Sequence, residues 1–571
     1  MSDDFAPNGA HAILETLRRW GVTQVFICPG STEAPFLDAS MDYPDIELVL
    51  TTHESAAVSM ADGFARATGR PGVVYLHTNV GLTNGLANLY SADVAGSPVV
   101  VLTGLKSTRI QNRRGFTTSP YMRDLVRPYC RWDWHSLDAE AVAEDLDRAL
   151  MFATSTPTGP TYLGLAQDLL QTDSPVPIPK LNREAGDGYS GRSRPDDRDL
   201  LRAAEALAEA SRPIIVAGGE VAKANGLPAL LALAERLSAP VLVEDRRTLE
   251  VATFPMDHPQ YAGAYRPDDP TVQEADLILL AGARTFIEFE PAATSPIPAH
   301  ATLIHLHPHA GEVARLYPTH LGLVGDASLG LEALAAALPS SDPAVEGARK
   351  EFLGRAVNRT VEHDAKMVRL AEELRDHHPI AVPALMHELS LNLRPGTVVV
   401  ADAVTSEPML MTYVKQREVA DYHTTAAGAL GWGMGAAVGI KLGRPDRDVV
   451  AVLGDGVFQF GIQALWTAVD QGTDVTFLVV NNRAYAAVRS ALYRFGGRAA
   501  RSEDYPASNI SGPRIDAIAM GYGLHAERVE KLDELSGALD RAWQAAGPAL
   551  IEVLTDPDDI GPGKPRFVPG G

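Results

Sequence analysis

Asp455 and Asn482 are the first side chains whose types and spacing suggest chemistry. The apolar run Val449–Leu453 leads directly into Gly454-Asp455-Gly456, and a second apolar run, residues 475–480, ends just before Asn482. A helical stretch joins the runs, so in a βαβ unit both polar side chains lie at neighbouring carboxyl ends of parallel strands. A carboxylate with a carboxamide oxygen suits Mg²⁺ or Ca²⁺, and glycines before a helix let a phosphate approach closely. The pattern predicts a joint metal and phosphate site.

Glu54 is the second candidate. It follows the apolar run Ile46–Leu50 and the tripeptide Thr51-Thr52-His53, and it precedes the helical stretch SAAVSMADGFARATG. A glutamate at such a strand-to-helix junction is expected to be partly buried beside apolar groups, which favours proton sharing over free ionisation. Taken alone, Glu54 also fits an ordinary first-turn residue that complements the helix dipole.

The elements that must position these residues follow an α/β pattern. Continuous apolar runs alternate with amphipathic helical stretches, which is typical of parallel sheets covered on both faces. We expect three doubly wound parallel-sheet domains at residues 1–172, 195–339 and 350–560, with linkers at 172–197 and 339–347 and a Gly/Pro-rich arm or flexible tail at 561–571. The predicted strands are Val73–Leu76, Val99–Leu102, Ile214–Ala217, Leu277–Leu280, Val398–Ala401, Val449–Leu453 and Val475–Val480.

Composition narrows the class of protein. A chain of 571 residues is too long to fold around a single hydrophobic core. Its net charge of −22 argues against nucleic acid or an anionic membrane as a partner. No apolar run reaches the ~18 residues that a membrane span needs. The acidic N-terminal sequence does not resemble a secretory signal, and only two cysteines, Cys28 and Cys130, are present. We therefore expect a cytoplasmic protein whose cysteines serve packing.

Residues 454–482 resemble the diphosphate-binding motif of thiamine-diphosphate enzymes. The resemblance implies thiamine diphosphate and Mg²⁺ as cofactors, with Asp455, Asn482 and the backbone carbonyl of Ala484 as metal ligands. Gly454, Gly456 and Tyr485 fall in the same cofactor-binding stretch. One departure is Val457, where many relatives place a serine near the phosphates, and we expect it to alter cofactor affinity without abolishing binding.

The stretch around Glu54 resembles the pyrimidine-binding domain of the same enzymes. The resemblance implies that Glu54 bonds to N1′ of the aminopyrimidine, which helps the cofactor lose its C2 proton. It further implies that Leu430 is the apolar wedge that bends the cofactor, and that the Gly428 carbonyl orients N4′. The resemblance then implies that the first domain binds the pyrimidine, the second is the central domain and the third binds the diphosphate. Without the family, residues 426–431 read as a close-packed helix start.

Nearly the whole chain resembles the benzoylformate decarboxylases and, more broadly, acetolactate-synthase-like enzymes. The motifs are Pro29-Gly30-Ser31, LHTNVGLTNGLAN, AVLGDG, ALWTA and NNRAYAAVR. The resemblance implies that Ser31 meets the substrate carboxylate and that His77 shuttles protons, which an imidazole does well near pH 7. His77 also fits a buried, hydrogen-bonded histidine at a strand end.

Two departures bear on the substrate. The family's second catalytic histidine falls on Phe289, which leaves His53 and Glu407 as candidates for proton handling, although both also fit structural roles. The wall residues after Asn482 are small, as the side chains of Ala486, Ala487 and Ala491 indicate. A roomier pocket predicts a substrate different from or larger than benzoylformate.

The resulting hypothesis is decarboxylation of a 2-oxo acid in a homodimer or homotetramer, since related enzymes build each site between two subunits. Carboligation with the same apparatus is one alternative. Cleavage of a 2-hydroxyacyl-CoA is another, with the basic segment Lys106–Arg114 on the CoA phosphates, although that segment also fits a solvated loop. A non-catalytic relative stays as a third. The middle segment carries Gly218-Gly219 without a GxGxxG fingerprint, and relatives there hold FAD, ADP or nothing.

Overall fold

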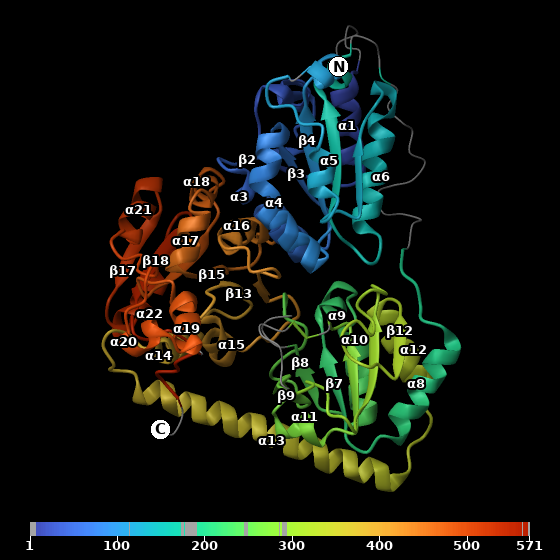
Figure 1. The fold of residues 1–571 in the computed structure, drawn as a ribbon, viewed down its shortest axis with the longest axis vertical. Helices are drawn as coiled ribbons and strands as arrows, with labels where there is room; N and C mark the ends of the chain where they lie inside the picture. The colour runs from blue at the N-terminus through green and yellow to red at the C-terminus, as the bar shows by residue number, and fades with distance from the viewer. Residues whose placement is uncertain are drawn as a thin grey trace.

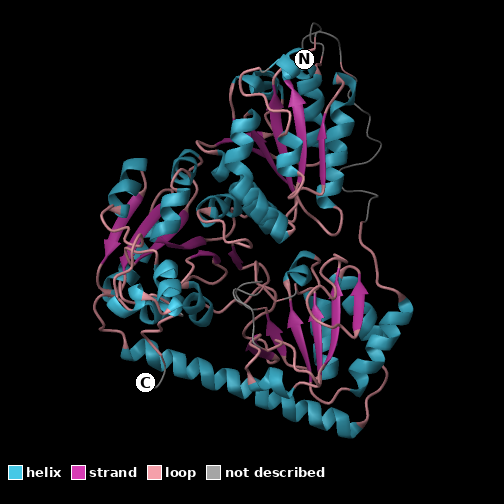
Figure 2. Cartoon of the chain, in the orientation of Figure 1, coloured by secondary structure: helices cyan, strands magenta, loops and turns pink. Residues whose placement is uncertain are grey.

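The protein consists of three α/β domains, each built on a six-stranded sheet (Figure 1). The computed structural model describes residues 7–113, 115–172, 176, 191–244, 249–284, 286–287, 294–561 and 563–568. All named strand pairs are parallel, and helices cover the faces of each sheet (Figure 2). The predicted fold class of three doubly wound domains is confirmed, and each of the seven predicted strands is present.

The first domain has the strand order β2-β1-β3-β4-β6-β5. The inner strands β1, β3, β4 and β6 are largely buried and rich in β-branched or aliphatic residues, which is why they read as apolar runs, whereas the outer strands β2 and β5 are partly exposed. The elements are α1 (Gly9–Arg19), β1 (Gln24–Cys28), α2 (Ala34–Ala39), β2 (Glu47–Leu50), α3 (Glu54–Thr68), β3 (Gly72–Leu76), α4 (Thr78–Ala95), β4 (Val99–Leu105), α5 (Met122–Val126), β5 (Trp132–His135), α6 (Val142–Thr154), β6 (Thr161–Ala166) and α7 (Gln167–Leu170).

The middle domain has the strand order β12-β11-β10-β7-β8-β9. Its elements are α8 (Asp197–Glu209), β7 (Pro213–Ala217), α9 (Gly219–Lys223), α10 (Leu227–Leu237), β8 (Val241–Val243), β9 (Tyr261–Ala264), α11 (Pro270–Glu274), β10 (Leu277–Ala281), β11 (Thr302–His307), β12 (Leu321–Val324) and α12 (Ala327–Ala337). Helix α13 (Pro343–Glu373) then runs along one side of the molecule to the third domain (Figure 1). Residues 343–347, which the sequence suggested as linker, form its first turn.

The third domain has the strand order β14-β13-β15-β16-β18-β17. Its elements are α14 (Val382–Asn392), β13 (Val398–Asp402), α15 (Glu407–Tyr413), β14 (Tyr422–Thr424), α16 (Trp432–Gly443), β15 (Val449–Gly454), α17 (Asp455–Gly461), α18 (Ala464–Asp470), β16 (Val475–Asn481), α19 (Ala486–Phe495), α20 (Arg498–Ser502), α21 (Ile515–Tyr522), β17 (His525–Val529), α22 (Leu535–Gln544) and β18 (Ala549–Leu554).

The end of the chain packs against the third domain over residues 563–568. The Gly563 amide donates to Ser490 Oγ at 2.9 Å, and Arg566 pairs with the buried Asp556 at 3.0 Å. The ring of Phe567 lies edge-on to His377, with 5.1 Å between ring centroids. Over these residues the predicted Gly/Pro-rich segment is therefore an arm held by a charge pair and an aromatic contact, not a free tail.

Helices α3 and α16 join the first domain to the third. A Cβ atom on Gly63 would overlap the backbone of Ala436, and one on Gly439 would overlap the backbone of Met60, so the two helices cross at very close range. At this interface the Trp432 indole donates to Asp62 Oδ2 at 2.7 Å. Since α3 begins at Glu54, this crossing fixes the candidate carboxylate relative to the third domain.

Candidate active site

Asp455 and Asn482 lie where the sequence predicts, at the carboxyl ends of β15 and β16, which pair in parallel. Asp455 is the first residue of α17, and its Oδ1 accepts from the Gly456 amide at 2.7 Å. Its Oδ2 is buried and has no hydrogen-bond partner among the described residues, and burial raises the pKa of Asp455 to about 6. A buried carboxylate oxygen without a donor is expensive to desolvate, and a bound cation would remove that cost.

The carboxamide of Asn482 is turned toward its own loop, with Oδ1 accepting from the Ala484 amide at 3.0 Å. The Ala484 carbonyl in turn accepts from the Ala486 amide at 2.9 Å. One carboxylate, one amide oxygen and one backbone carbonyl form a hard-oxygen set of the kind that Mg²⁺ prefers. Among the described residues no group of three or more His, Cys, Asp or Glu side chains is placed to hold a metal. The candidate set thus depends on a single carboxylate.

A cavity of about 180 Å³ opens beside these residues. It is lined by the glycine-rich start of α17, by Leu430 and by the small or apolar side chains of Val457, Ala486, Ala487 and Val488. Tyr485 also lines the cavity, and its ring would meet a Cβ atom placed on Gly456 at 2.8 Å. Ala491, the third small wall residue expected from the sequence, is exposed on α19. Gly428 has a φ of +67°, which explains a glycine there.

The carboxyl edge of the first sheet carries the other predicted residues side by side. Glu54 follows β2, Ser31 follows β1 and His77 follows β3, and these three strands are neighbours in the order β2-β1-β3. Glu54 Oε2 accepts from Asn84 Nδ2 at 3.0 Å, and Glu54 is half-buried at the first turn of α3. The sequence therefore predicted both the edge and the residues on it.

Sequence reasoning missed Glu33, which lies beneath His77. Glu33 is fully buried, and its Oε2 bonds to His77 Nδ1 at 2.8 Å and accepts from the Gly30 amide at 2.7 Å. Thr32 Oγ1 donates to the other carboxylate oxygen and lies 3.1 Å from His77 Nδ1. A side chain at Gly30 would overlap the His77 ring, and one at Gly104 would overlap the Glu33 carboxylate.

The contact with Glu33 holds the His77 imidazole in one orientation. With Glu33 on Nδ1, the His77 ring has a fixed orientation and its Nε2 is left for a reactant. In the sequence Glu33 reads only as a polar residue after Pro-Gly-Ser-Thr, three positions beyond Gly30. The signal that could have revealed it is the pair of glycines, Gly30 and Gly104, which leave room for the dyad.

Within one chain, Glu54 is not among the described residues that line the cavity of the third domain. The residues that line the cavity all lie between 403 and 488, in the third domain, as far as the chain is described. We call the polar edge of the first sheet and the cavity of the third domain the two candidate half-sites. Exposed apolar side chains border both of them. Val80, in the first turn of α4 next to Gly81, is 46% exposed, and Val488, at the cavity, is 42% exposed.

The alternative proton-handling residues have structural roles. His53 caps α3, with Nδ1 accepting from the Ser55 amide at 3.1 Å. Glu407 is buried and accepts from Thr424 Oγ1 at 2.6 Å and from the Tyr422 hydroxyl at 3.2 Å. Phe289 lies outside the described residues. Burial raises the pKa of Cys28 to about 11, which leaves that thiol protonated and supports a packing role.

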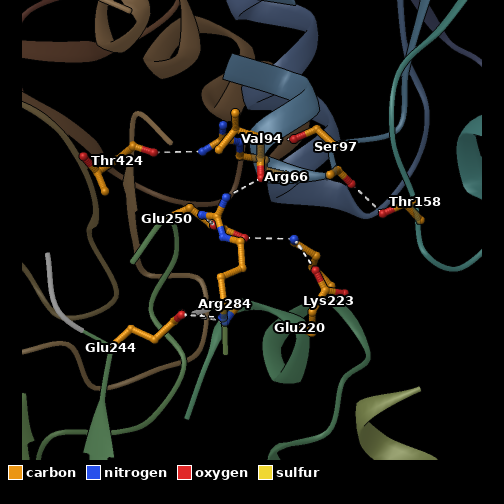
Figure 3. Close-up of polar contacts among 12 residues, drawn as sticks. Arg66, Val94, Ser97, Thr158, Glu220, Lys223, Glu244, Glu250, Arg284 and Thr424 are labelled. Carbon is orange, nitrogen blue, oxygen red and sulfur yellow. Dashed lines mark hydrogen bonds and ion pairs between the residues drawn. The ribbon is translucent and has the colours of Figure 1, made fainter. Parts of the chain in front are cut away.

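The Gly218-Gly219 turn of the middle domain is occupied by the chain's own glutamate side chains. Glu244 Oε2 accepts from the Gly219 amide at 3.0 Å. Glu244 Oε1 accepts from the Arg284 amide, also at 3.0 Å (Figure 3). Glu250 pairs with Lys223 at 2.9 Å and with the Arg284 guanidinium. Backbone amides at the start of a helix and the end of a strand are typical phosphate donors, and here a carboxylate already accepts from them.

The same network links all three domains. Arg284 donates to the carbonyl of Val94 on α4, and Arg66 on α3 donates to the Thr424 carbonyl at 2.8 Å (Figure 3). The Thr424 amide in turn donates to the Glu250 carbonyl at 3.1 Å. The middle domain is therefore connected to both the first and the third domain through polar contacts.

Three family models match the chain in order. Residues 7–124 match the thiamine pyrophosphate enzyme N-terminal TPP binding domain, residues 200–334 the central domain and residues 402–553 the C-terminal TPP binding domain. Among the described residues no helix is long and apolar enough to cross a membrane.

Curated and solved relatives agree with these models. The chain is 33% identical to benzoylformate decarboxylase of Pseudomonas aeruginosa over 550 residues, covering 95% of this chain and 98% of that one. It is 28% identical to a probable acetolactate synthase large subunit of Methanocaldococcus jannaschii, covering 99% and 94%. The solved structure of a Rhodococcus jostii RHA1 4-hydroxybenzoylformate decarboxylase superposes with a TM-score of 0.82 at 26% identity, covering 97% and 100%. With its fold, all three domain models and a relative of 33% identity in agreement, the chain belongs to the thiamine pyrophosphate enzymes.

Proposed function

We propose that the protein catalyses the non-oxidative decarboxylation of a 2-oxo acid with thiamine diphosphate and Mg²⁺. The observation that carries the proposal is the row of polar groups at the first sheet edge, Glu54, Ser31 and His77, with the buried Glu33 on the imidazole. Decarboxylation needs a group that receives the carboxylate and a group that returns a proton to carbon, and Ser31 and His77 supply both.

The third domain holds the cofactor in this proposal. Asp455, Asn482 and the Ala484 carbonyl bind Mg²⁺, and the amides at the start of α17 receive the diphosphate. Leu430 of the cavity wall would contact the bound cofactor, and the Gly428 carbonyl would be available to its amino group. When bound, thiamine diphosphate would supply a nucleophilic carbon and a sink for the electron pair that remains on the substrate carbon when CO₂ leaves.

The first domain supplies the residues that activate the cofactor and return a proton to the substrate. Glu54 holds a proton at the pyrimidine nitrogen, Ser31 orients the substrate carboxylate, and His77 delivers a proton through Nε2 while Glu33 stabilises the imidazolium. Phe289 stands where the family has a second catalytic histidine. Because His77 delivers the proton here, no other base is assigned to replace that histidine.

A complete site requires two copies of the chain. The cavity is lined by third-domain residues, whereas Glu54 is held by Asn84 of the first domain. The exposed apolar residues Val80 and Val488 beside the two half-sites fit a surface that a second subunit covers. We therefore propose a homodimer or a homotetramer, with each Glu54 facing the cavity of a partner.

Two experiments test the proposal. The first measures CO₂ release from a panel of 2-oxo acids with and without an acceptor aldehyde. Release with an aldehyde product supports decarboxylation, whereas a condensed product that appears only with acceptor identifies a carboligase. The second measures subunit mass by light scattering, and a monomer that turns over would overturn the shared site.

One substitution separates a catalyst from a non-catalytic relative. Glu54→Gln keeps the shape of the side chain but removes the carboxylate, so CO₂ release should fall by about 100-fold or more. Equal turnover by the variant would contradict the role of Glu54. Cleavage of 2-hydroxyacyl-CoA esters in the absence of CO₂ release would favour the lyase alternative.

A further inference from the structure

Lys106 extends the row of polar groups at the first sheet edge by one strand. It follows directly after β4, and the sheet order β2-β1-β3-β4 places it beyond His77 and on the side opposite Glu54. Adjacent strands lie about 4.8 Å apart, so the end of β4 is about 14 Å from the end of β2, which bears Glu54. The polar groups at this edge therefore run from Glu54, past Ser31 and His77, to Lys106.

The lysine side chain lies against the reacting groups. Lys106 Nζ is 3.4 Å from Ser31 Oγ, and the side chain is half-buried. In the part of the chain that the structure describes, Lys106 has no carboxylate partner within ion-pair distance. The nearby Glu33 carboxylate already binds His77. The ammonium thus faces the candidate substrate position with unpaired charge, in a protein whose net charge is −22.

The loop that carries Lys106 is held in place. Thr108 donates to Asp168 through its amide at 2.9 Å and through its hydroxyl at 2.6 Å, and Gln111 donates to the Lys106 carbonyl. Arg109 and Arg113 continue the loop and are exposed. These contacts hold the loop in place next to Ser31, while its arginine side chains stay exposed to solvent, as expected for a solvated basic loop.

The charge is poorly suited to the reacting carboxylate itself. Decarboxylation moves negative charge away from that carboxylate, so an ammonium that holds it would stabilise the ground state and slow the reaction. An ammonium that binds a different anionic group of the same substrate carries no such cost. The phosphates of CoA lie at the far end of a long pantetheine arm, whereas Lys106 is one strand from His77.

We propose that Lys106 binds a second anionic group of the substrate, which makes the preferred substrate a short 2-oxo acid with a terminal carboxylate, sulfonate or phosphonate. The inference rests on the proposed decarboxylation and names its substrate class. Lys106 pairs with the distal anion, and the exposed Arg109 and Arg113 of the same loop add to the local positive potential.

The test compares matched substrates on the cofactor-loaded enzyme. Steady-state kinetics give kcat/KM for 2-oxoglutarate and for 2-oxovalerate, which has a methyl group in place of the terminal carboxylate. Sulfopyruvate and phosphonopyruvate, each against 2-oxobutyrate, identify which anion is preferred. The wild type should favour the dianion, and Lys106→Gln should reduce that preference by about 10- to 100-fold, the size expected for one charged hydrogen bond. Lys106→Glu should reverse it.

A control separates this site from general charge effects. Arg148→Gln removes one exposed cation from α6, away from the sheet edge, and should leave the preference of the wild type intact. If Lys106→Gln lowers turnover of both acids equally, the lysine acts on the reacting carboxylate and the inference is wrong. A wild type that prefers 2-oxovalerate would also overturn it.

A binding measurement distinguishes failure of the inference from failure of the proposed function. Glutarate and valerate lack the 2-oxo group and cannot be decarboxylated by this chemistry, and calorimetry should find tighter binding of glutarate, lost in Lys106→Gln. Such binding without CO₂ release from any 2-oxo acid would refute the decarboxylation and keep the anion site. Equal binding of the two acids, or tight binding of CoA alone, would refute the anion site.

Discussion

Gly439→Ala tests whether the crossing of α3 and α16 sets the geometry of the first and third domains. A methyl carbon on Gly439 would overlap the Met60 carbonyl oxygen and would lie 2.7 Å from the Met60 carbonyl carbon and 2.9 Å from its Cα. Carbon atoms pack at about 3.5–4.0 Å, so the methyl group is about 1 Å too close. Both neighbours belong to helix backbone, and the two helices must therefore separate by about 1 Å.

The expected loss of stability follows from two opposing terms. Overpacking a tight contact costs about 1–3 kcal/mol and more where no side chain can move aside. Replacing a helical glycine by alanine returns about 1 kcal/mol through helix propensity. We expect a net loss of about 2 kcal/mol, which corresponds to a thermal midpoint lower by about 4–8 °C for a domain of 150–250 residues.

The assay is thermal unfolding at one fixed scan rate, followed by CO₂ release at 25 °C. Gly354→Ala is the matched control, because Gly354 lies within α13 with nothing within 4 Å of an added Cβ. That variant should gain about 0.5–1 kcal/mol. The reasoning is refuted if Gly439→Ala stabilises the protein as Gly354→Ala does, or if it leaves both the midpoint and turnover unchanged.

Three further outcomes are expected. Glu33→Gln should lower kcat about 10- to 100-fold, because His77 loses a charged partner worth about 1.5–3 kcal/mol, and steady-state kinetics with unchanged KM would distinguish this from lost binding. Asp455→Ala should weaken Mg²⁺-dependent binding of thiamine diphosphate about tenfold or more, measured by calorimetry with and without EDTA. Burial beside Glu250 raises the pKa of Glu244 to about 8 from 4.5, so the folded state holds an extra proton between these values. Stability should therefore fall as pH rises from about 4.5 to 8, by up to about 1.4 kcal/mol per pH unit. Glu244→Gln should flatten that slope in urea unfolding, and an unchanged slope would exclude Glu244 as its source.

Local patterns were sufficient to predict the central strands of the sheets and the position of Asp455 and Asn482 at neighbouring strand ends. Apolar strands that are buried on both faces leave a continuous signal, and Asp455 and Asn482 each follow such a strand directly. Their proximity follows from one crossover connection, which has a fixed hand. The edge position of Glu54 and His77 follows in the same way from the strands β2 and β3.

Features that depend on contacts between distant segments were not predictable. Glu33 reaches His77 only because Gly30 and Gly104 leave space, and Glu244 reaches the Gly219 amide from another strand. Neither pairing leaves a periodic pattern in the sequence. The sequence pattern predicts a linker where α13 begins, because Pro343 lies in a stretch rich in proline and serine. Proline is also common in the first turn of a helix, and α13 begins at this proline.

The most direct test is CO₂ release from a panel of 2-oxo acids, measured on the oligomer loaded with thiamine diphosphate and Mg²⁺ and on its Glu54→Gln variant. The expected result is release of CO₂ with an aldehyde product from the wild type, fastest for acids with a second anionic group, and a loss of about 100-fold or more in the variant. Bound cofactor without CO₂ from any acid would contradict the assignment of the two half-sites to decarboxylation.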